Sequence, residues 1–89
     1  MNDIEKQIHQ HACDNDTEHT MRIITINHVD HTPTHFIKSI QFDFKSQATI
    51  ELTSNIQEAQ RFTFAFSCML YHHLSEISEA KYHSHYPIK

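Results

Sequence analysis

The sequence of 89 residues contains no glycine, and this absence excludes several classes of protein. Loops that cradle phosphate groups need glycine, because it lets the backbone approach the ligand closely and adopt positive φ. The P-loop, the dinucleotide-binding fingerprint, the kinase glycine-rich loop and the nucleophile elbow are therefore excluded in their usual forms. Nucleotide-dependent chemistry is not expected, and turns must use Asn, Asp, Ser and Pro.

Cysteines and long apolar runs are also scarce. Cys13 and Cys68 lie far apart and form no disulfide framework, so reduced thiols are expected. No run of about eighteen apolar residues is present, and no membrane span is expected. The acidic, polar N-terminus is unlike a signal peptide, which favours a cytoplasmic location.

The formal net charge of −4 is concentrated near the N-terminus. In residues 1–20 only Lys6 opposes the acidic side chains, which are Asp3, Glu5, Asp14, Asp16 and Glu18. Nucleic-acid-binding proteins usually carry a basic face, and the sequence shows none. An acidic segment is typical of a protein that docks on a basic groove, and the alternative is a solvated first helix.

The first half of the chain predicts one short helix and two strands. Residues 3–13 read as a helix that Asn2 or Asp3 can cap, within an acidic N-terminal helical segment covering residues 1–18. Met21–Val29 is rich in β-branched residues and predicts a strand. His35–Lys45 predicts a second strand after a turn that contains Pro33.

A third strand, Ala48–Thr53, is expected to complete an antiparallel meander. Alternation places an apolar set on the face that meets a helix: Phe36, Ile40, Phe42, Phe44, Ile50 and Leu52. The other face is expected to meet solvent: Ile37, Ser39, Gln41, Asp43, Thr49 and Glu51.

Ser54–Lys81 predicts one long helix that starts with a capping box between Ser54 and Gln57. Its core-facing stripe follows helical spacing: Ile56, Ala59, Phe62, Thr63, Phe66, Met69, Leu70, His73, Leu74 and Ile77. His73 within that stripe is expected to be a hydrogen-bonded core histidine, with a buried acid or base as the alternative. Residues 82–89 are expected to form a tail, because Pro87 stops any helix.

These elements predict a single small α+β domain over residues 1–89, in the order αβββα. A three-stranded antiparallel meander packs on one long C-terminal helix. The short N-terminal helix is expected at an edge of the sheet or beside the long helix.

A second apolar stripe on the long helix consists of Phe64, Cys68 and Tyr71. Aromatic residues at helical spacing act as anchors in protein interfaces, so this stripe is a candidate partner-binding or homodimer face. The alternative is that the first helix or the C-terminal tail covers it within the monomer.

The chain has ten histidines, and some have the spacing of metal ligands. The candidate zinc ligands are His9, His11, Cys13, Cys68 and His72. The two closely spaced ligand pairs of a structural zinc site do not occur, so no metal or other cofactor is expected. Cys68 and His72 could also form a nucleophile–base pair, but no oxyanion donors accompany them and no enzymatic activity is expected.

The combined features predict a non-enzymatic module that binds a protein partner and blocks its functional surface. In size, charge and missing chemistry, the chain is similar to small phage or mobile-element inhibitors, including anti-CRISPR proteins. That resemblance implies a nucleic-acid-binding effector complex as partner, no direct contact with nucleic acid, and the host-cell cytoplasm as location. The alternatives are a histidine- and cysteine-rich zinc-binding protein and a small nucleic-acid-binding regulator.

Overall fold

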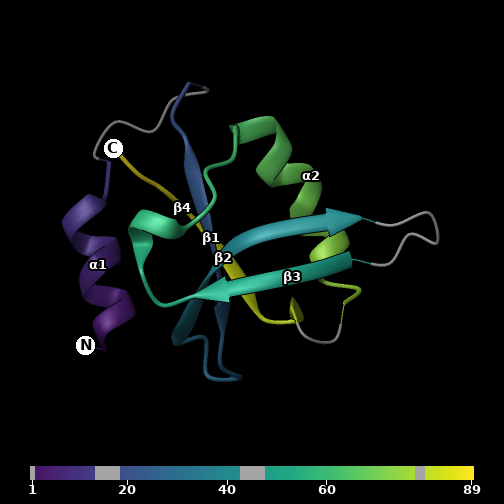
Figure 1. Ribbon diagram of the computed structural model, residues 1–89, viewed down its shortest axis with the longest axis horizontal. Helices are drawn as coiled ribbons and strands as arrows, with labels where there is room; N and C mark the ends of the chain where they lie inside the picture. The colour runs from purple at the N-terminus through teal and green to yellow at the C-terminus, as the bar shows by residue number, and fades with distance from the viewer. Residues whose placement is uncertain (1, 14–18, 43–47, 78–79) are drawn as a thin grey trace.

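The structure is a computed structural model that describes residues 2–13, 19–42, 48–77 and 80–89. These residues form an α+β fold with a four-stranded antiparallel sheet in the order β3-β2-β1-β4 (Figure 1). The strands are β1 (Arg22–Asn27), β2 (Pro33–Phe42), β3 (Ala48–Thr53) and β4 (His83–Pro87). The helices are α1 (Asp3–His11), the 3₁₀ helix η1 (Ile56–Glu58) and α2 (Phe64–Leu74).

Helix α1 confirms the predicted N-terminal helix, and its start is fixed by local hydrogen bonds. The Asn2 side chain accepts a hydrogen bond from the backbone N–H of Glu5 at 2.8 Å. The Glu5 carboxylate accepts one from the backbone N–H of Asn2 at 3.2 Å, which completes a capping box. Ile4 and Ile8 are buried beneath the helix.

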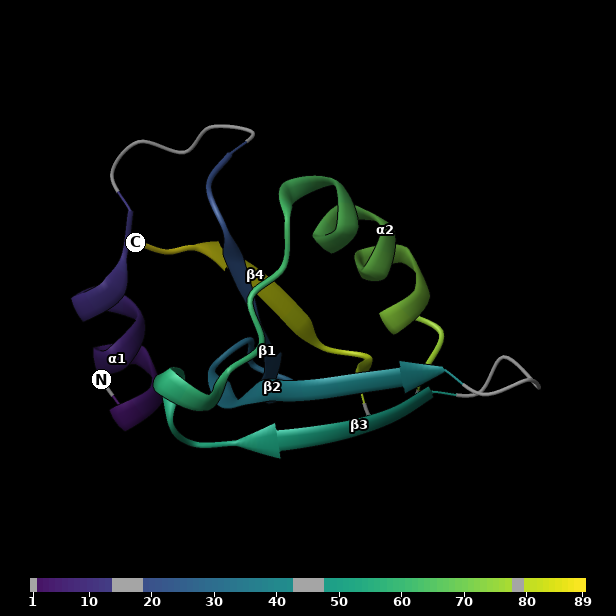
Figure 2. The ribbon, with the colours of Figure 1, turned by 45° about the horizontal axis from the view of Figure 1, so that its top comes forward.

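Both faces of the sheet carry an apolar cluster, whereas one solvated face was predicted. The cluster beneath α1 and η1 contains Ile4, Ile8, Ile23, Phe36, Ile56, Ala59 and Ile88. The cluster beneath α2 contains Ile24, Ile26, Ile37, Phe62, Leu70, Leu74 and Ala80. The predicted place of α1 beside the second helix is therefore wrong, because successive apolar residues of β1 point to opposite faces and each face needs its own cover (Figure 2).

A bulge in β2 explains why its predicted apolar face is divided. The register shifts between Ile37 and Ser39, so one extra residue enters β2 opposite β3. Phe36 joins the cluster beneath α1, while Ile37 and Ile40 pack in the cluster beneath α2. Phe44, which was assigned to the same face, lies outside the described residues.

The predicted helix over Ser54–Lys81 is wrong in its extent. The Ser54–Gln57 capping box does not form, because Asn55 supplies the side chain that accepts from the Gln57 backbone N–H at 3.0 Å. Asn55 caps only the short helix η1, and the chain is extended at Ala59.

Helix α2 begins only after Phe62 has paired with β1. The backbone groups of Phe62 and Arg22 exchange two hydrogen bonds of 2.8 Å. Thr63 is then the N-cap of α2, and its hydroxyl accepts from the Phe66 backbone N–H at 3.2 Å. Strand-like pairing at Phe62 is incompatible with a continuous helix, so long-range contacts overrule the local periodicity.

The predicted core stripe is divided accordingly. Buried members of the stripe are Ile56, Ala59, Phe62, Leu70 and Leu74. Exposed members are Thr63, Phe66, Met69 and His73. The prediction of a core histidine at His73 is wrong, because that side of α2 faces outward toward Phe42, whose ring centroid lies 6.4 Å away.

The predicted C-terminal tail is strand β4. It pairs antiparallel with β1 from the Arg22↔Pro87 pair to the Ile26↔His83 pair. Beyond it, Lys89 donates a backbone hydrogen bond to the His11 carbonyl at 3.0 Å, which ties the C-terminal residue to the last residue of α1. Among the residues that the structure describes, none of the helices has the length and apolar content needed to span a membrane.

Candidate functional site

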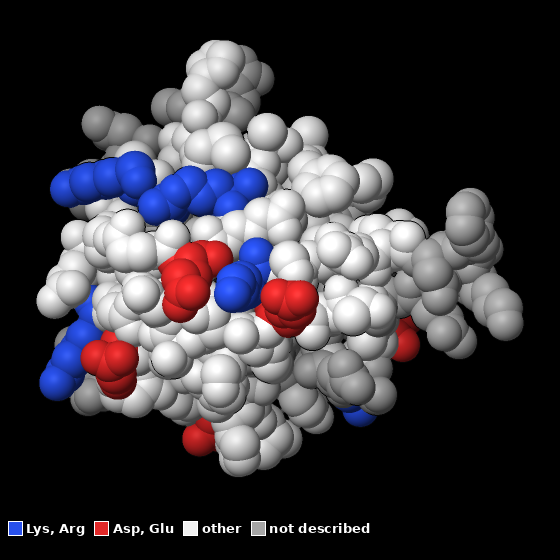
Figure 3. All heavy atoms as spheres, in the orientation of Figure 1, with Lys and Arg blue, Asp and Glu red and all other residues white. Residues whose placement is uncertain are grey.

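Two of the predicted partner-binding acidic residues, Asp3 and Glu5, are described by the structure, and both have local roles in α1. Asp3 accepts a hydrogen bond from the Gln7 side chain at 3.1 Å, and Glu5 completes the capping box. Both carboxylates also lie at the helix N-terminus, where negative charge is favourable. Asp14, Asp16 and Glu18 lie outside the described residues. On the face seen in Figure 3, coloured basic and acidic side chains are interspersed.

The second apolar stripe lies on the side of α2 next to β4. Phe64 and Tyr71 are 41% and 45% exposed, and Cys68 is half-buried. The Tyr71 ring contacts two imidazoles of β4, with centroid distances of 4.5 Å to His83 and 5.7 Å to His85. The C-terminal segment thus flanks this stripe, and α1 packs on the other face of the sheet.

Arg22 connects β4 to this side of α2. Its side chain is only 5% exposed, and its guanidinium lies 4.9 Å from the centre of the Phe64 ring. The Arg22 Nη1 atom lies 3.2 Å from His85 Nδ1. Because a guanidinium can only donate, Nδ1 of His85 accepts this hydrogen bond, which requires a neutral imidazole.

His83 has the opposite arrangement. Its Nδ1 lies 2.8 Å from the Ala80 carbonyl oxygen, so Nδ1 carries the hydrogen and donates it. The Nε2 atom is buried and has no hydrogen-bond partner among the described residues. The Nδ1 atom thus accepts a hydrogen bond in His85 and donates one in His83, so the two imidazoles of β4 use this atom in opposite ways.

A hollow of about 150 Å³ lies beside these rings and is lined by Cys68, Tyr71, His72 and His85. Ligand sites for organic molecules usually measure about 300–1,000 Å³, so this hollow suits a few water molecules. Cys68 and His72 do line it together, and Tyr71 and His85 complete the lining.

The candidate zinc ligands do not converge in the described part of the chain. His9 is exposed, and His11 and Cys13 are half-buried on the α1 side of the sheet. Cys68 and His72 belong to α2 on the other face. Within residues 2–13, 19–42, 48–77 and 80–89, no group of three His, Cys, Asp or Glu side chains could hold a metal ion.

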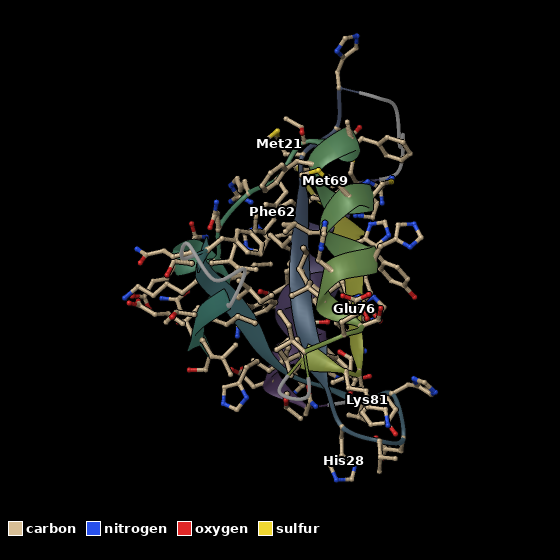
Figure 4. The ribbon with its side chains drawn as sticks, turned by 90° about the vertical axis from the view of Figure 1, so that its right-hand side faces the viewer. Met21, His28, Phe62, Met69, Glu76 and Lys81 are labelled. Carbon is tan, nitrogen blue, oxygen red and sulfur yellow. The ribbon has the colours of Figure 1, made fainter. Side chains whose placement is uncertain are left out.

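The sequence did not reveal a second apolar surface, which we call the α2–hairpin face and define as Phe42, Leu52, Phe66 and Met69. These side chains are between 37% and 50% exposed. Helix α2 contacts mainly β1 and β4, so the same side of β2 and β3 is left partly uncovered. Figure 4 shows Met69 with Phe62 and Met21 toward one end of the molecule, and His28 and Lys81 toward the other.

A shallow groove of about 340 Å³ lies on the α1 side. Its lining includes Glu5 and His9 of α1, His31 of the β1–β2 turn and Tyr86 of β4. His31 has φ of 70°, a left-handed conformation that is uncommon outside glycine. The lining is mixed in character, because ionisable and aromatic side chains alternate with apolar ones such as Ile8 and Pro33.

The turn beside that groove is held by Asp30. The backbone N–H of Thr32 donates to the Asp30 carboxylate at 2.9 Å and lowers the pKa of this carboxyl below its ordinary value. The Thr32 hydroxyl and the nearby His28 lower this pKa further. A lowered pKa means that the carboxylate stabilises the fold above its unfolded-state pKa, and that this effect is lost as the pH falls.

Comparison with known proteins identified no family for this chain. No protein-family model matches the chain, and no similar protein was found among curated proteins or solved structures.

Proposed function

We propose that this protein is a non-enzymatic interaction module that binds a partner protein through α2 and covers the partner's functional surface. The observation that supports this proposal is the exposure of large apolar side chains on two sides of one short helix. Phe66 and Met69 are exposed on α2, as are Phe42 on β2 and Leu52 on β3. Phe64 lies against Arg22 of β1, and Tyr71 lies beside β4. Grouped exposed apolar side chains are typical of interaction sites, and aromatic anchors dominate binding energy in such sites.

The α2–hairpin face is our preferred docking surface. Phe66 stacks on the buried Phe62 with a centroid distance of 5.8 Å, so it is held in place before a partner binds. A fixed aromatic anchor loses little conformational entropy on binding. In contrast, the Phe64 side is already flanked by Arg22 and the imidazoles of β4.

The acidic N-terminal segment gives the proposal a partner class. Carboxylates compete well for a basic groove, so a nucleic-acid-binding effector complex is the partner we favour. A small phage or mobile-element inhibitor of this kind, comparable to anti-CRISPR proteins, would act in the host-cell cytoplasm. In this account α2 supplies the binding energy and the acidic segment supplies steering.

Affinity capture from host lysate with matched variants tests this proposal. We expect the double variant Phe66→Ser/Met69→Ser to capture at least about tenfold less partner than wild type, because two anchors are removed. Val29→Ser is the control, since Val29 is 59% exposed in the β1–β2 turn away from α2. Equal capture by wild type and the double variant would contradict the proposed surface.

The acidic segment is tested separately in the same assay. Replacing the five acidic residues Asp3, Glu5, Asp14, Asp16 and Glu18 by their amides should slow capture at low salt and have less effect at high salt, because screening weakens steering. An unchanged salt dependence would contradict the role of the acidic segment in competing for a basic groove. It would not contradict binding through α2.

A further inference from the structure

The outer edge of β3 is open within the described chain. β3 ends the sheet order, and β2 is its strand neighbour. Figure 2 shows β3 at the margin of the molecule, away from α2. An edge strand presents unpaired backbone N–H and C=O groups that can pair with another strand.

We propose that β3 pairs antiparallel with β3 of a second copy of this chain across a two-fold axis. This association is independent of any other partner and so goes beyond the proposed function. The strand is self-complementary, because Ile50 packs toward the cluster beneath α2 and Leu52 pairs with Ile37 of that cluster. The exposed Thr49 and Glu51 occupy the alternate positions.

The two-fold symmetry keeps the apolar side of β3 separate from its polar side. A two-fold axis perpendicular to the sheet leaves each face of one copy continuous with the same face of the other. Ile50 and Leu52 therefore meet apolar positions across the axis, and Thr49 and Glu51 meet polar ones. An unrelated strand would need the same alternation and a matching charge pattern to fit this edge equally well.

The charge of Glu51 selects the register of the pairing. Centring on Glu51 would place this carboxylate opposite its own symmetry copy, and like charges directly opposite each other are destabilising. Centring on Ile50 instead places Glu51 of one copy opposite Thr49 of the other. This second register pairs residues 48–52 without a like-charge contact, and it is the register that we assign.

Such a dimer would change the partner-binding surface. Both α2 helices would lie on the same side of the joined sheet, with the open halves of the two sheets between them. The two copies of the α2–hairpin face would then border one shared trough, which doubles the apolar area presented to a partner.

Sedimentation equilibrium of the full chain tests the proposal. We expect a reversible dimer, and we expect Thr49→Glu to raise its Kd about tenfold, because it creates two like-charge pairs with Glu51. Thr49→Lys should lower the Kd, since the new ammonium faces Glu51 of the other copy. Gln41→Glu is the matched control. Gln41 lies on β2, opposite Thr49 and on the side of β3 away from the two-fold axis, so this variant adds the same charge without placing it in the dimer interface.

The outcomes separate this proposal from the proposed function. A chain that stays monomeric at all concentrations overturns the dimer, as does a dimer whose Kd is equal in Thr49→Glu and Thr49→Lys. A dimer that is lost only in Phe64→Ser/Tyr71→Ser also overturns it and assigns self-association to α2. The Thr49 variants leave the α2–hairpin face intact, so a failed partner capture has no bearing on these results.

Discussion

At the scale of single residues, Arg22 shows how a charged side chain is accommodated under a small sheet. Burying a charge is unfavourable unless hydrogen bonds and packing compensate for lost hydration. Arg22 combines a hydrogen bond to His85 with contact against the Phe64 ring. It thereby links β1, β4 and α2 at one point.

We expect Arg22→Ala to lower the free energy of unfolding by about 2–3 kcal/mol, because a charged hydrogen bond and its packing are lost together. Arg22→Lys should recover part of this loss, since a lysine keeps the charge but not the planar donor group. Urea denaturation of both variants measures the effect. A change below about 0.5 kcal/mol for Arg22→Ala would show that the arginine is not a structural link.

His31 stores backbone strain in the β1–β2 turn. We expect His31→Val to destabilise the protein by about 1–2 kcal/mol, because a β-branched residue is poorly tolerated at positive φ. His31→Gly should stay within about 0.5 kcal/mol of wild type, since relief of strain is offset by the freer unfolded chain. Both variants remove the ring contact with Tyr82, so their difference reports the backbone alone. Equal melting curves would contradict the left-handed conformation.

At the scale of elements, the beginning of α2 distinguishes the observed fold from one long helix. Thr63→Ala should cost about 1 kcal/mol, because the threonine hydroxyl caps α2. Ser54→Ala should stay within about 0.5 kcal/mol, since Ser54 caps no helix in the structure. Thermal denaturation of the two variants compares them directly. The reverse order of effects would support a helix that starts at Ser54.

The elements that could be predicted from sequence are those fixed by nearby residues. Helix α1 has its cap and its apolar stripe within a single short segment, and the first three strands have local alternation or β-branched residues. The end of the long apolar stripe could not be predicted, because the break at Phe62 depends on pairing with Arg22 far away in sequence. Strand β4 was missed for the same reason, since its polar sequence becomes a strand only beside β1.

At the scale of the whole molecule, the candidate site was predicted only in part. Phe64, Cys68 and Tyr71 were identified by their spacing on α2, and their partner-binding role stays a prediction. The α2–hairpin face could not be derived, because a helix laid across every strand would have buried Phe66 and Met69. The displacement of α2 toward β1 and β4 is a property of the complete fold.

The central claim is that α2 is the face through which this protein binds another. Hydroxyl-radical footprinting of the captured complex tests it most directly, because Met69 is half exposed and reacts readily when free. We predict that oxidation of Met69 and Phe66 falls strongly in the complex, while oxidation of His28 at the far end stays unchanged. Undiminished oxidation of Met69 and Phe66 in a complex that still contains its partner would contradict the claim.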